Sequence, residues 1–414
     1  HLVDVNTPYI DSLASSGIRF SNGYATHHTC APSRAAILSG RYQQRLGFYE
    51  IWEVQKGIPE KEKLLPQYLK EAGYHTALIG KWHLGEKAYN HPTAKGYDRF
   101  YGFLGGMHDY FDPFIGDSWE GGARGFAPIF DQTDTVRDIN YLTIEFTDQA
   151  LGFIENCGSL PFFLTLSYNA PHVMLQAPPE YIERYEGTKG KYRMIRAMNK
   201  VLDDQIGRLL HFLEARDLRK NTMIIYVSDN GGTRINHNWK LKGAKSWFYE
   251  GGIRVPFIIS YPVVLPSRTV FDAPVSILDI FPTVLAAAGI ADPKDKEPDG
   301  KNLLPFLIRN HGPDPHEFLY WSSDPYFDRW AVRNGDWKAI RESEDLNGKP
   351  GVALYNLRND VGEEKNLIGR YPEKFKELER LYRKWIGGMP PSLVGDDEWT
   401  PNGNGWMYKY KESK

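Results

Sequence analysis

Four short, almost wholly apolar runs constrain the fold more than any other feature of the sequence. They span residues 75–79, 161–168, 222–228 and 255–260. Strands covered on both faces have this composition. Patterns of helical spacing alternate with them, at residues 66–72, 141–156, 191–215 and 277–288. The alternation predicts an α/β fold: a large, mostly parallel (mixed) sheet with helices on both faces.

The pattern changes beyond residue 317. Short strand-like runs at residues 318–321, 330–333, 337–341 and 353–357 are joined by turns such as Asn334-Gly335-Asp336. A charged amphipathic helix follows over residues 372–385. We therefore expect two units: an α/β domain over residues 1–315, and a C-terminal subdomain over residues 316–414 with a small antiparallel sheet, a helix and a tail.

Charge and cysteine content exclude several classes of protein. The 414 residues carry 50 Lys and Arg against 52 Asp and Glu, a net charge of -2, so no broad basic field would attract nucleic acid. No apolar run is long enough to span a membrane. Two cysteines, Cys30 and Cys157, exclude a disulfide framework. Cys157 follows an apolar helical pattern, which predicts a buried thiol.

Polar residues follow three of the apolar runs, at the point where each run ends. Lys81 and His83 follow the first run, His172 follows the second, and Asp229-Asn230 follows the third. α/β folds build sites at the carboxyl ends of their strands. Asp and Asn oxygens suit Ca²⁺ or Mg²⁺. Taken singly, Lys-x-His is typical of a solvated surface pair and Asp-Asn-Gly-Gly of a plain turn.

The segment Cys30-Ala31-Pro32-Ser33-Arg34 precedes a predicted helix. A thiol at a helix N-terminus has a lowered pKa and is reactive. The free N–H groups there, with the Arg34 guanidinium, favour a bound oxyanion such as sulfate. The simpler alternative is a structural cysteine at a helix cap. Lys242 and Lys245 lie either in an exposed basic loop or in an anion clamp.

These motifs, in this order, resemble those of the type I sulfatases of the alkaline phosphatase superfamily. The resemblance rests on the Cys30 segment, residues 80–85, 170–172 and 228–232, and residues 249–256. Residues 39–50 are most similar to the N-acetylgalactosamine-6-sulfatase and polysaccharide (carrageenan-type) sulfatase branch. The resemblance covers essentially the whole chain, less clearly residues 85–137 and the tail.

The resemblance implies a role for each matching residue. A maturation enzyme would convert Cys30 to formylglycine, whose hydrate attacks sulfur, and Arg34 would stabilise that group. Lys81 and Lys245 would hold sulfate oxygens, while His83 would take a proton from the second hydroxyl. His172, with Lys245, would protonate the leaving oxygen. The metal ligands would be Asp229, Asn230 and the residue formed from Cys30, and the metal Ca²⁺, with Mg²⁺ possible.

One feature departs from the family pattern. Type I sulfatases have a strand before the segment that matches residues 7–20, and two Asp residues at its end bind the same ion. The sequence begins at His1, too late to contain them. We expect the natural chain to extend further at its N-terminus. The alternative is a truncated form that binds metal poorly and is inactive.

The favoured function is hydrolysis of a sulfate ester on a galactose- or N-acetylgalactosamine-containing saccharide. The alternatives are a formylglycine-dependent phosphodiesterase or phosphonate monoester hydrolase, and a non-catalytic glycan-binding relative. Residues 105–125 are a candidate specificity loop. We expect a periplasmic or secreted protein, with its oligomeric state open. Candidate substrate-binding residues are the aromatics Trp52, Tyr110, Trp119 and Trp247, and Lys242.

Overall fold

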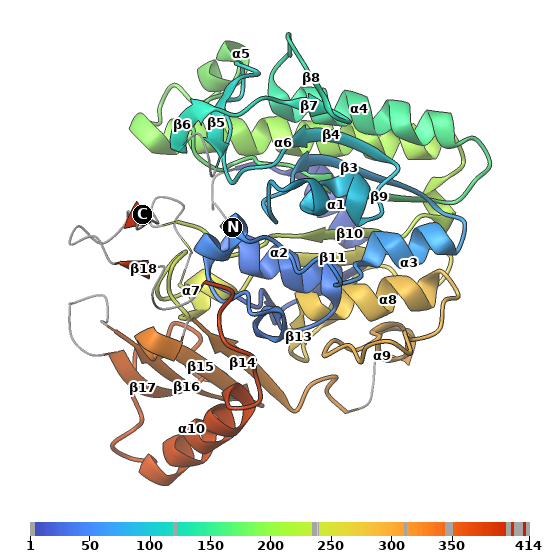
Figure 1. The fold of residues 1–414 in the computed structure, drawn as a ribbon. Helices are drawn as coiled ribbons and strands as arrows, with labels where there is room; N and C mark the ends of the chain where they lie inside the picture. The colour runs from blue at the N-terminus through green and yellow to red at the C-terminus, as the bar shows by residue number, and fades with distance from the viewer. Residues whose placement is uncertain are drawn as a thin grey trace.

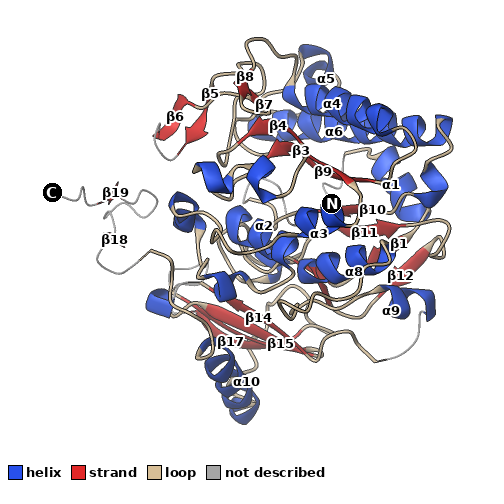
Figure 2. Ribbon diagram, turned by 45° about the vertical axis from the view of Figure 1, so that its right-hand side comes forward, coloured by secondary structure: helices blue, strands red, loops and turns tan. Residues whose placement is uncertain are grey.

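Two sheets form the body of the molecule (Figures 1 and 2). The structure, a computed structural model, describes residues 5–118, 122–233, 238, 240–309, 313–323, 325–343, 351–394, 399–400 and 409–410. The first sheet has the order β8-β7-β4-β3-β9: Asp134–Thr135, Phe130–Asp131, Arg99–Phe103, His75–Lys81 and Phe162–Ser167. The second has the order β10-β11-β1-β12: Ile224–Val227, Phe257–Ser260, Ile18–Phe20 and Thr269–Phe271.

The mixed character of the sheets confirms the predicted fold class. β3 runs parallel to both β4 and β9, so the carboxyl ends of β3 and β9 lie at the same edge. β11, by contrast, is antiparallel to β10 and to β1. Parallel neighbours need a crossover connection, usually a helix. Among the described residues of the connection from β10 to β11, the one helix is the four-residue α7 (Glu250–Ile253), and β11 runs antiparallel to β10.

Helices cover both faces of the sheets, as the sequence predicts (Figure 1). One apolar cluster joins α4 (Leu142–Cys157) and α6 (Gly190–Ala215) to β3 and β4. A second cluster packs α2 (Cys30–Ser39) against the opposite face of the same strands. α3 (Leu65–Glu71) packs on α8 (Ile280–Ala287). The helix expected over residues 277–288 begins as a short 3-10 helix, η6 (Ile277–Asp279).

Apart from the C-terminal strands and helix described below, the remaining elements are short. They are α1 (Pro8–Ser15), β2 (Gly23–Tyr24), η1 (Gln43–Leu46), η2 (Ile51–Gln55), η3 (Ala88–Asn90), η4 (Pro92–Lys95), β5 (Ile115–Ser118), β6 (Gly122–Phe126), α5 (Pro179–Glu183), η5 (Arg219–Asn221), β13 (Val275–Ser276), α9 (Leu304–Arg309), η7 (Pro325–Phe327), β18 (Trp399–Thr400) and β19 (Lys409–Tyr410). Within the described chain, no helix combines the length and apolarity that crossing a lipid bilayer would require.

A cavity of about 2040 Å³ separates the two sheets. Among the described residues, β9 and β10 are the end strands of their sheets, and both line this cavity. Their side chains are only partly buried, whereas those of β11 are fully buried. The described strands of the α/β part thus belong to two mixed sheets. At one end the cavity reaches Lys81, His172 and Asp229.

The C-terminal strands form the expected antiparallel sheet, in the order β14 (Phe318–Ser322), β15 (Trp330–Asn334), β16 (Trp337–Glu342) and β17 (Gly351–Asn356). α10 (Pro372–Ile386) packs on it through Phe375, Leu378 and Tyr382. The domain boundary at residues 315–316 stays a prediction. A fully buried ion cluster joins this sheet to α7, because Lys338 Nζ of β16 lies 2.9 Å from both Glu250 Oε1 and Glu363 Oε1.

Candidate active site

Cys30 lies at the N-terminus of α2, where the sequence predicted it. Thr29 before it is extended, Pro32 occupies the first turn, and Gly40 ends the helix in the left-handed conformation. The Cys30 side chain is buried, and its Sγ lies 3.3 Å from His83 Nδ1. The free N–H groups of the first helical turn therefore surround a thiol that is in direct contact with an imidazole.

His83 takes its position from the end of β3. Lys81 is the last residue of that strand, and the chain then turns so that His83 has a φ of 62°. Gly106 lies against the imidazole, where a Cβ would be only 2.6 Å from His83 Nε2. A side chain at position 106 would therefore displace the His83 ring from its present position.

Positive charge makes the Cys30 thiol acidic. Burial alone would raise its pKa, but the charges of Lys81 and Lys245, with His83, hold the pKa well below the usual value. Burial in turn lowers the pKa of Lys81. A thiolate, or a bound anion in its place, is the charge that this environment favours.

His172 and Lys245 form a second pair, on separate loops. His172 Nδ1 lies 2.8 Å from the Val173 carbonyl, which can only accept, so Nδ1 carries the proton. His172 Nε2 then accepts from Lys245 Nζ at 3.2 Å. Burial, followed by the charges of Lys81 and Lys245, lowers the pKa of His172 to about 3. The imidazole is therefore neutral at ordinary pH, and its Nε2 is free to accept the hydrogen bond from Lys245 Nζ.

Arg34 links α2 to two strand ends. Its Nε donates to Asp229 Oδ2 at 2.8 Å, and its second nitrogen donates to the Lys81 carbonyl at 3.0 Å and to Ser167 Oγ at 2.7 Å. Burial would raise the pKa of Asp229, but Arg34, Lys81 and Lys245 lower it well below the usual range. Asp229 is therefore a carboxylate under all working conditions.

The Asp229-Asn230 pair has the donors of a hard-cation site. Asn230 donates through Nδ2 to the Gly231 carbonyl, while its buried Oδ1 has no hydrogen-bond partner among the described residues. Such an orphaned amide oxygen beside a carboxylate fits an oxygen-preferring ion. The two side chains fit Ca²⁺ or Mg²⁺ in donor type, and they supply part of the six to eight oxygens that Ca²⁺ takes.

The structure brings the predicted catalytic and metal residues into one site. The Cys30–His83, His172–Lys245 and Arg34–Asp229 contacts lie within mutual electrostatic range, because Lys81 and Lys245 influence Cys30, His172 and Asp229 alike. Asn230 lines the same cavity as Arg34, Lys81 and His172. Their individual chemical roles stay predictions.

The predicted substrate-binding residues make their contacts with residues other than the catalytic ones. The Lys242 ammonium donates to the Tyr355 hydroxyl at 3.0 Å. Trp52 is buried, with its ring 5.9 Å from that of Phe327. Trp247 is half-buried against an apolar cluster under the C-terminal sheet, and Trp119 lies outside the described residues. Sugar contacts for these residues stay predictions.

Tyr110 has an indirect link to the site. Its ring is fully buried and stacks on Tyr141, and its hydroxyl donates to the His172 carbonyl at 3.1 Å. A buried ring offers no face to a sugar, so Tyr110 serves here to position the His172 loop. Sequence reasoning missed this contact because it depends on packing between distant segments.

Sequence reasoning also missed Ser167 and the cluster of His27, His28 and Glu50. Ser167, the last residue of β9, accepts from Arg34 and donates to the Lys81 carbonyl at 2.7 Å. Ser167 directly precedes Tyr168 at the end of an apolar run, and this position at a predicted strand end could have marked it as a site residue. His27 and His28 are adjacent and only two residues before Cys30, so they too could have been noted.

The comparison with protein families decides the identity. Residues 2–290 match the family model described as "Sulfatase", and residues 237–385 match "N-sulphoglucosamine sulphohydrolase, C-terminal". The chain belongs to the sulfatase family. It is an enzyme that hydrolyses sulfate esters, in agreement with the prediction from the Cys30 motif.

Relatives place this sulfatase in the expected branch. It is 33% identical to human N-acetylgalactosamine-6-sulfatase, over 85% of this chain and 73% of that protein. It is 31% identical to the uncharacterized sulfatase YdeN of Escherichia coli, over 94% and 78% of the two chains. The crystal structure of Ps i-CgsB in complex with k-i-k-neocarrahexaose is similar with a TM-score of 0.86 and 32% identity, over 94% of this sulfatase and 89% of that chain.

Proposed function

We propose that this sulfatase removes sulfate from a galactose- or N-acetylgalactosamine-containing saccharide, with formylglycine formed from Cys30 and with Ca²⁺. The observation that carries the proposal is the contact of Cys30 Sγ with His83 Nδ1 inside a cluster of cations. The similarity to human N-acetylgalactosamine-6-sulfatase and to the carrahexaose-bound structure favours a galactose-type sugar.

In this proposal, formylglycine supplies a hydrated aldehyde as the nucleophile toward sulfur. Conversion of Cys30 requires a maturation enzyme as partner. His83 Nδ1, 3.3 Å from Sγ, takes up the proton of the second hydroxyl. The Lys81 ammonium, buried at the end of β3, pairs with a sulfate oxygen. Arg34, fixed by Ser167 and the Lys81 carbonyl, orients this end of the site.

The His172–Lys245 pair acts at the leaving oxygen. His172 Nε2 accepts from Lys245 Nζ, and the neutral imidazole leaves the Lys245 ammonium as the proton source of the pair. A sugar alkoxide is a poor leaving group, so a proton delivered as the bond breaks lowers the barrier. The pair would thus make sugar sulfates, rather than only activated aryl sulfates, good substrates.

Asp229 and Asn230 would hold Ca²⁺, with Mg²⁺ as the second choice. The bound ion supplies Lewis-acid polarisation of the sulfate group. The carboxylate of Asp229 is held ionised by Arg34, and Asn230 Oδ1 has a free lone pair for coordination. We further propose action in the periplasm or outside the cell, since a polymeric sulfated substrate is found there.

The test is replacement of Cys30 combined with mass analysis. Enzyme co-expressed with a formylglycine-generating enzyme should contain an aldehyde at position 30 and release sulfate from N-acetylgalactosamine 6-sulfate or a carrageenan fragment. Cys30→Ala should abolish turnover. Cys157→Ala is the matched control, because that thiol donates to the Phe153 carbonyl within α4, away from the site.

Two results would contradict the proposal. Wild-type turnover by Cys30→Ala would rule out the nucleophile. A strong preference for an aryl phosphodiester over an aryl sulfate would favour the phosphodiesterase alternative instead.

A further inference from the structure

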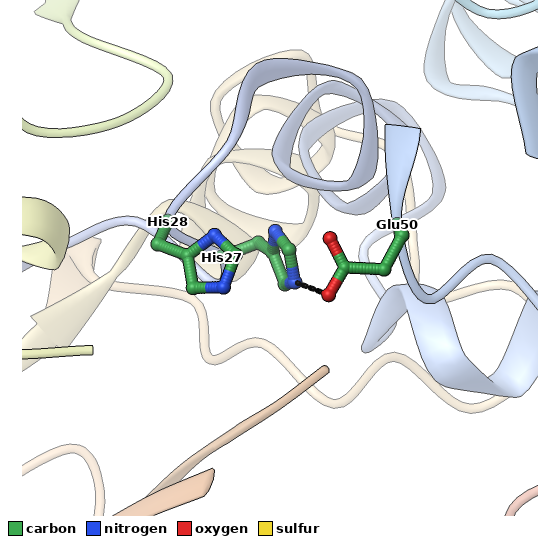
Figure 3. A group of neighbouring side chains, drawn as sticks. All are labelled: His27, His28 and Glu50. Carbon is green, nitrogen blue, oxygen red and sulfur yellow. Dashed lines mark ion pairs between the residues drawn. The ribbon is translucent and has the colours of Figure 1, made fainter. Parts of the chain in front are cut away.

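Three buried side chains gather beneath the loop that carries Cys30. His27 and His28 lie between β2 and α2, and Glu50 directly precedes η2 (Figure 3). Their exposed fractions are 0%, 1% and 5%. One potential ligand atom from each lies within 4.8 Å of the other two.

Three of the four ring nitrogens of these imidazoles have no hydrogen-bond partner within the described part of the chain. They are His27 Nε2 and both ring nitrogens of His28, and all three are buried. A buried polar atom without a partner costs about 1–3 kcal/mol, so native structures rarely tolerate several together. An occupant that accepts lone pairs would satisfy these nitrogens.

The donor set identifies the class of that occupant. Two imidazoles and one carboxylate are ligands typical of Zn²⁺ and related divalent transition metals, whereas Ca²⁺ prefers oxygens alone. We propose that His27, His28 and Glu50 bind one such ion, of the Zn²⁺ class, at a structural site separate from Asp229 and Asn230.

The surroundings of His27 fit a metal ligand. A metal-bound His ordinarily donates its other N–H to a nearby acceptor. His27 Nδ1 lies 2.8 Å from Thr29 Oγ1, which can accept that proton and leave the lone pair of Nε2 for the ion. In the metal-free tautomer the same Nδ1 accepts instead from the Thr29 N–H at 3.2 Å. His27 Nε2 points at Glu50 Oε1, 3.7 Å away (Figure 3).

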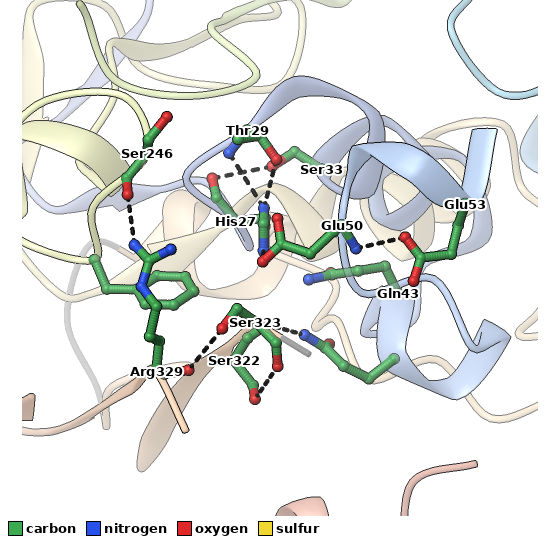
Figure 4. A network of polar contacts seen from close by, with 12 residues as sticks. His27, Thr29, Ser33, Gln43, Glu50, Glu53, Ser246, Ser322, Ser323 and Arg329 are labelled. Atoms are coloured by element: carbon green, nitrogen blue, oxygen red, sulfur yellow. Dashed lines mark hydrogen bonds and ion pairs between the residues drawn. The ribbon is translucent and has the colours of Figure 1, made fainter. Parts of the chain in front are cut away.

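The neighbouring groups would enclose the ion. The Phe248 ring lies 4.3 Å from the His28 ring and excludes water from that side. Arg329 and Lys245 are cations near the cluster, and the Arg329 guanidinium is paired with Glu342 Oε2 at 2.7 Å. Figure 4 shows Gln43 together with Glu50 and His27. Gln43 Nε2 donates to the Thr26 carbonyl at 3.2 Å. Its own Oε1 is buried without a partner among the described residues, and it is a candidate fourth donor.

The geometry needs only a small closure. Ligand atoms in a tetrahedral zinc site are about 3.3 Å apart, as zinc–ligand distances near 2.0–2.1 Å require. The His27–Glu50 distance of 3.7 Å is close to this value, and the ligand atoms of all three residues lie within 4.8 Å of one another, so the site closes by movements of about 1.5 Å or less. The ion would hold residues 27–28, immediately before Cys30, in a fixed position.

The experiment is metal titration of the purified, chelator-treated protein. Zn²⁺ binding is measured by competition with a chromophoric chelator, and Co²⁺ binding by its visible absorption bands. We expect one Zn²⁺ per chain, a raised Tm, and tetrahedral Co²⁺ bands. Cys30→Ala and Asp229→Asn should bind equally well, which separates this site from the Cys30 thiol and from the Ca²⁺ ligands. Both variants are inactive under the proposed function, so the readout does not depend on activity.

Two substitutions test the ligands. His28→Gln and Glu50→Gln should each weaken Zn²⁺ binding by about 100-fold or more, at least as much as loss of an outer-shell partner. Unchanged affinity in both, with circular dichroism showing folded protein, would overturn the proposal. If neither variant folds, the wild-type protein provides the test. Absence of stoichiometric Zn²⁺ binding and of tetrahedral Co²⁺ bands in the wild-type protein would also overturn the proposal.

Discussion

Positive side chains around Cys30 exceed the negative ones. Lys81, Lys245 and His83 act on the thiol, while Arg34 is paired with Asp229. Burial of Lys81 disfavours its charge, so an anion that enters the site relieves that cost. A sulfate ester is such an anion, and its oxygens would replace the water that these cations lose.

At this scale, the first prediction concerns His172. His172→Gln should lower kcat for a sugar sulfate by about 10²–10⁴-fold, because proton delivery to the leaving oxygen is impaired. An aryl sulfate with an acidic leaving group should lose much less. Steady-state kinetics on both substrates measures the difference.

His211→Gln is the matched control, since His211 is exposed on α6 and its ring contacts Tyr9. Equal losses for the sugar and aryl substrates would show that His172 acts other than on the leaving group.

A pH dependence follows from the same residue. Burial lowers the pKa of His172 to about 3, below the unfolded value near 6.5. Between these values the unfolded chain binds more protons than the folded one, so stability rises with pH. The contribution of His172 is complete above pH 6.5 and is lost progressively as pH falls toward 3.

Urea unfolding of wild type and His172→Gln, measured from pH 7 to pH 4, checks this dependence. The wild-type free energy of unfolding should fall more steeply with acid than that of the variant. Parallel curves would contradict the low pKa.

Among the elements, the turn after β3 and the loop of Gly106 set the catalytic geometry. Gly106→Ala should place a Cβ 2.6 Å from the His83 ring, so the ring must shift and its contact with Cys30 Sγ changes. We expect kcat to fall by about 10²-fold, as a displacement near 1 Å costs, with the fold retained. Kinetics together with circular dichroism measures both effects.

Gly152→Ala provides the control. Gly152 lies in α4 with nothing within 4 Å of its Cβ position, so alanine there should raise stability by up to about 1 kcal/mol and leave kcat unchanged. If Gly106→Ala also leaves kcat unchanged, the His83 ring does not depend on the space that Gly106 leaves open.

The positions of helices and strands were predicted from the sequence more accurately than any other feature. Apolar periodicity located α4, α6 and α10 to within one or two residues, and the Pro161–Tyr168 run contains β9. Because strand ends carry the polar motifs, the site residues followed from the same pattern. The antiparallel direction of β11 did not, since strand direction depends on the connection and not on composition. The positive φ of His83 likewise depends on its tertiary contacts.

For the whole molecule, the buried ion cluster couples the two predicted units. Lys338→Met leaves Glu250 and Glu363 buried without the ammonium that both contact. The free energy of unfolding should fall by about 3–5 kcal/mol, the cost of breaking a buried pair by removing one partner. Chemical denaturation measures this loss.

Arg358→Met is the matched control, because the Arg358–Asp336 pair lies at the surface and should contribute less than about 1 kcal/mol. If Lys338→Met also lowers the free energy of unfolding by less than about 1 kcal/mol, apolar packing can replace the ion cluster.

The buried ion cluster has a consequence for how the polypeptide can be divided. Glu250 belongs to α7 and Lys338 to β16, and Lys338 Nζ lies 2.9 Å from Glu250 Oε1 with both side chains fully buried. A nick in the backbone between these two elements leaves that contact intact, so the two pieces should stay associated after limited proteolysis and co-elute in size-exclusion chromatography.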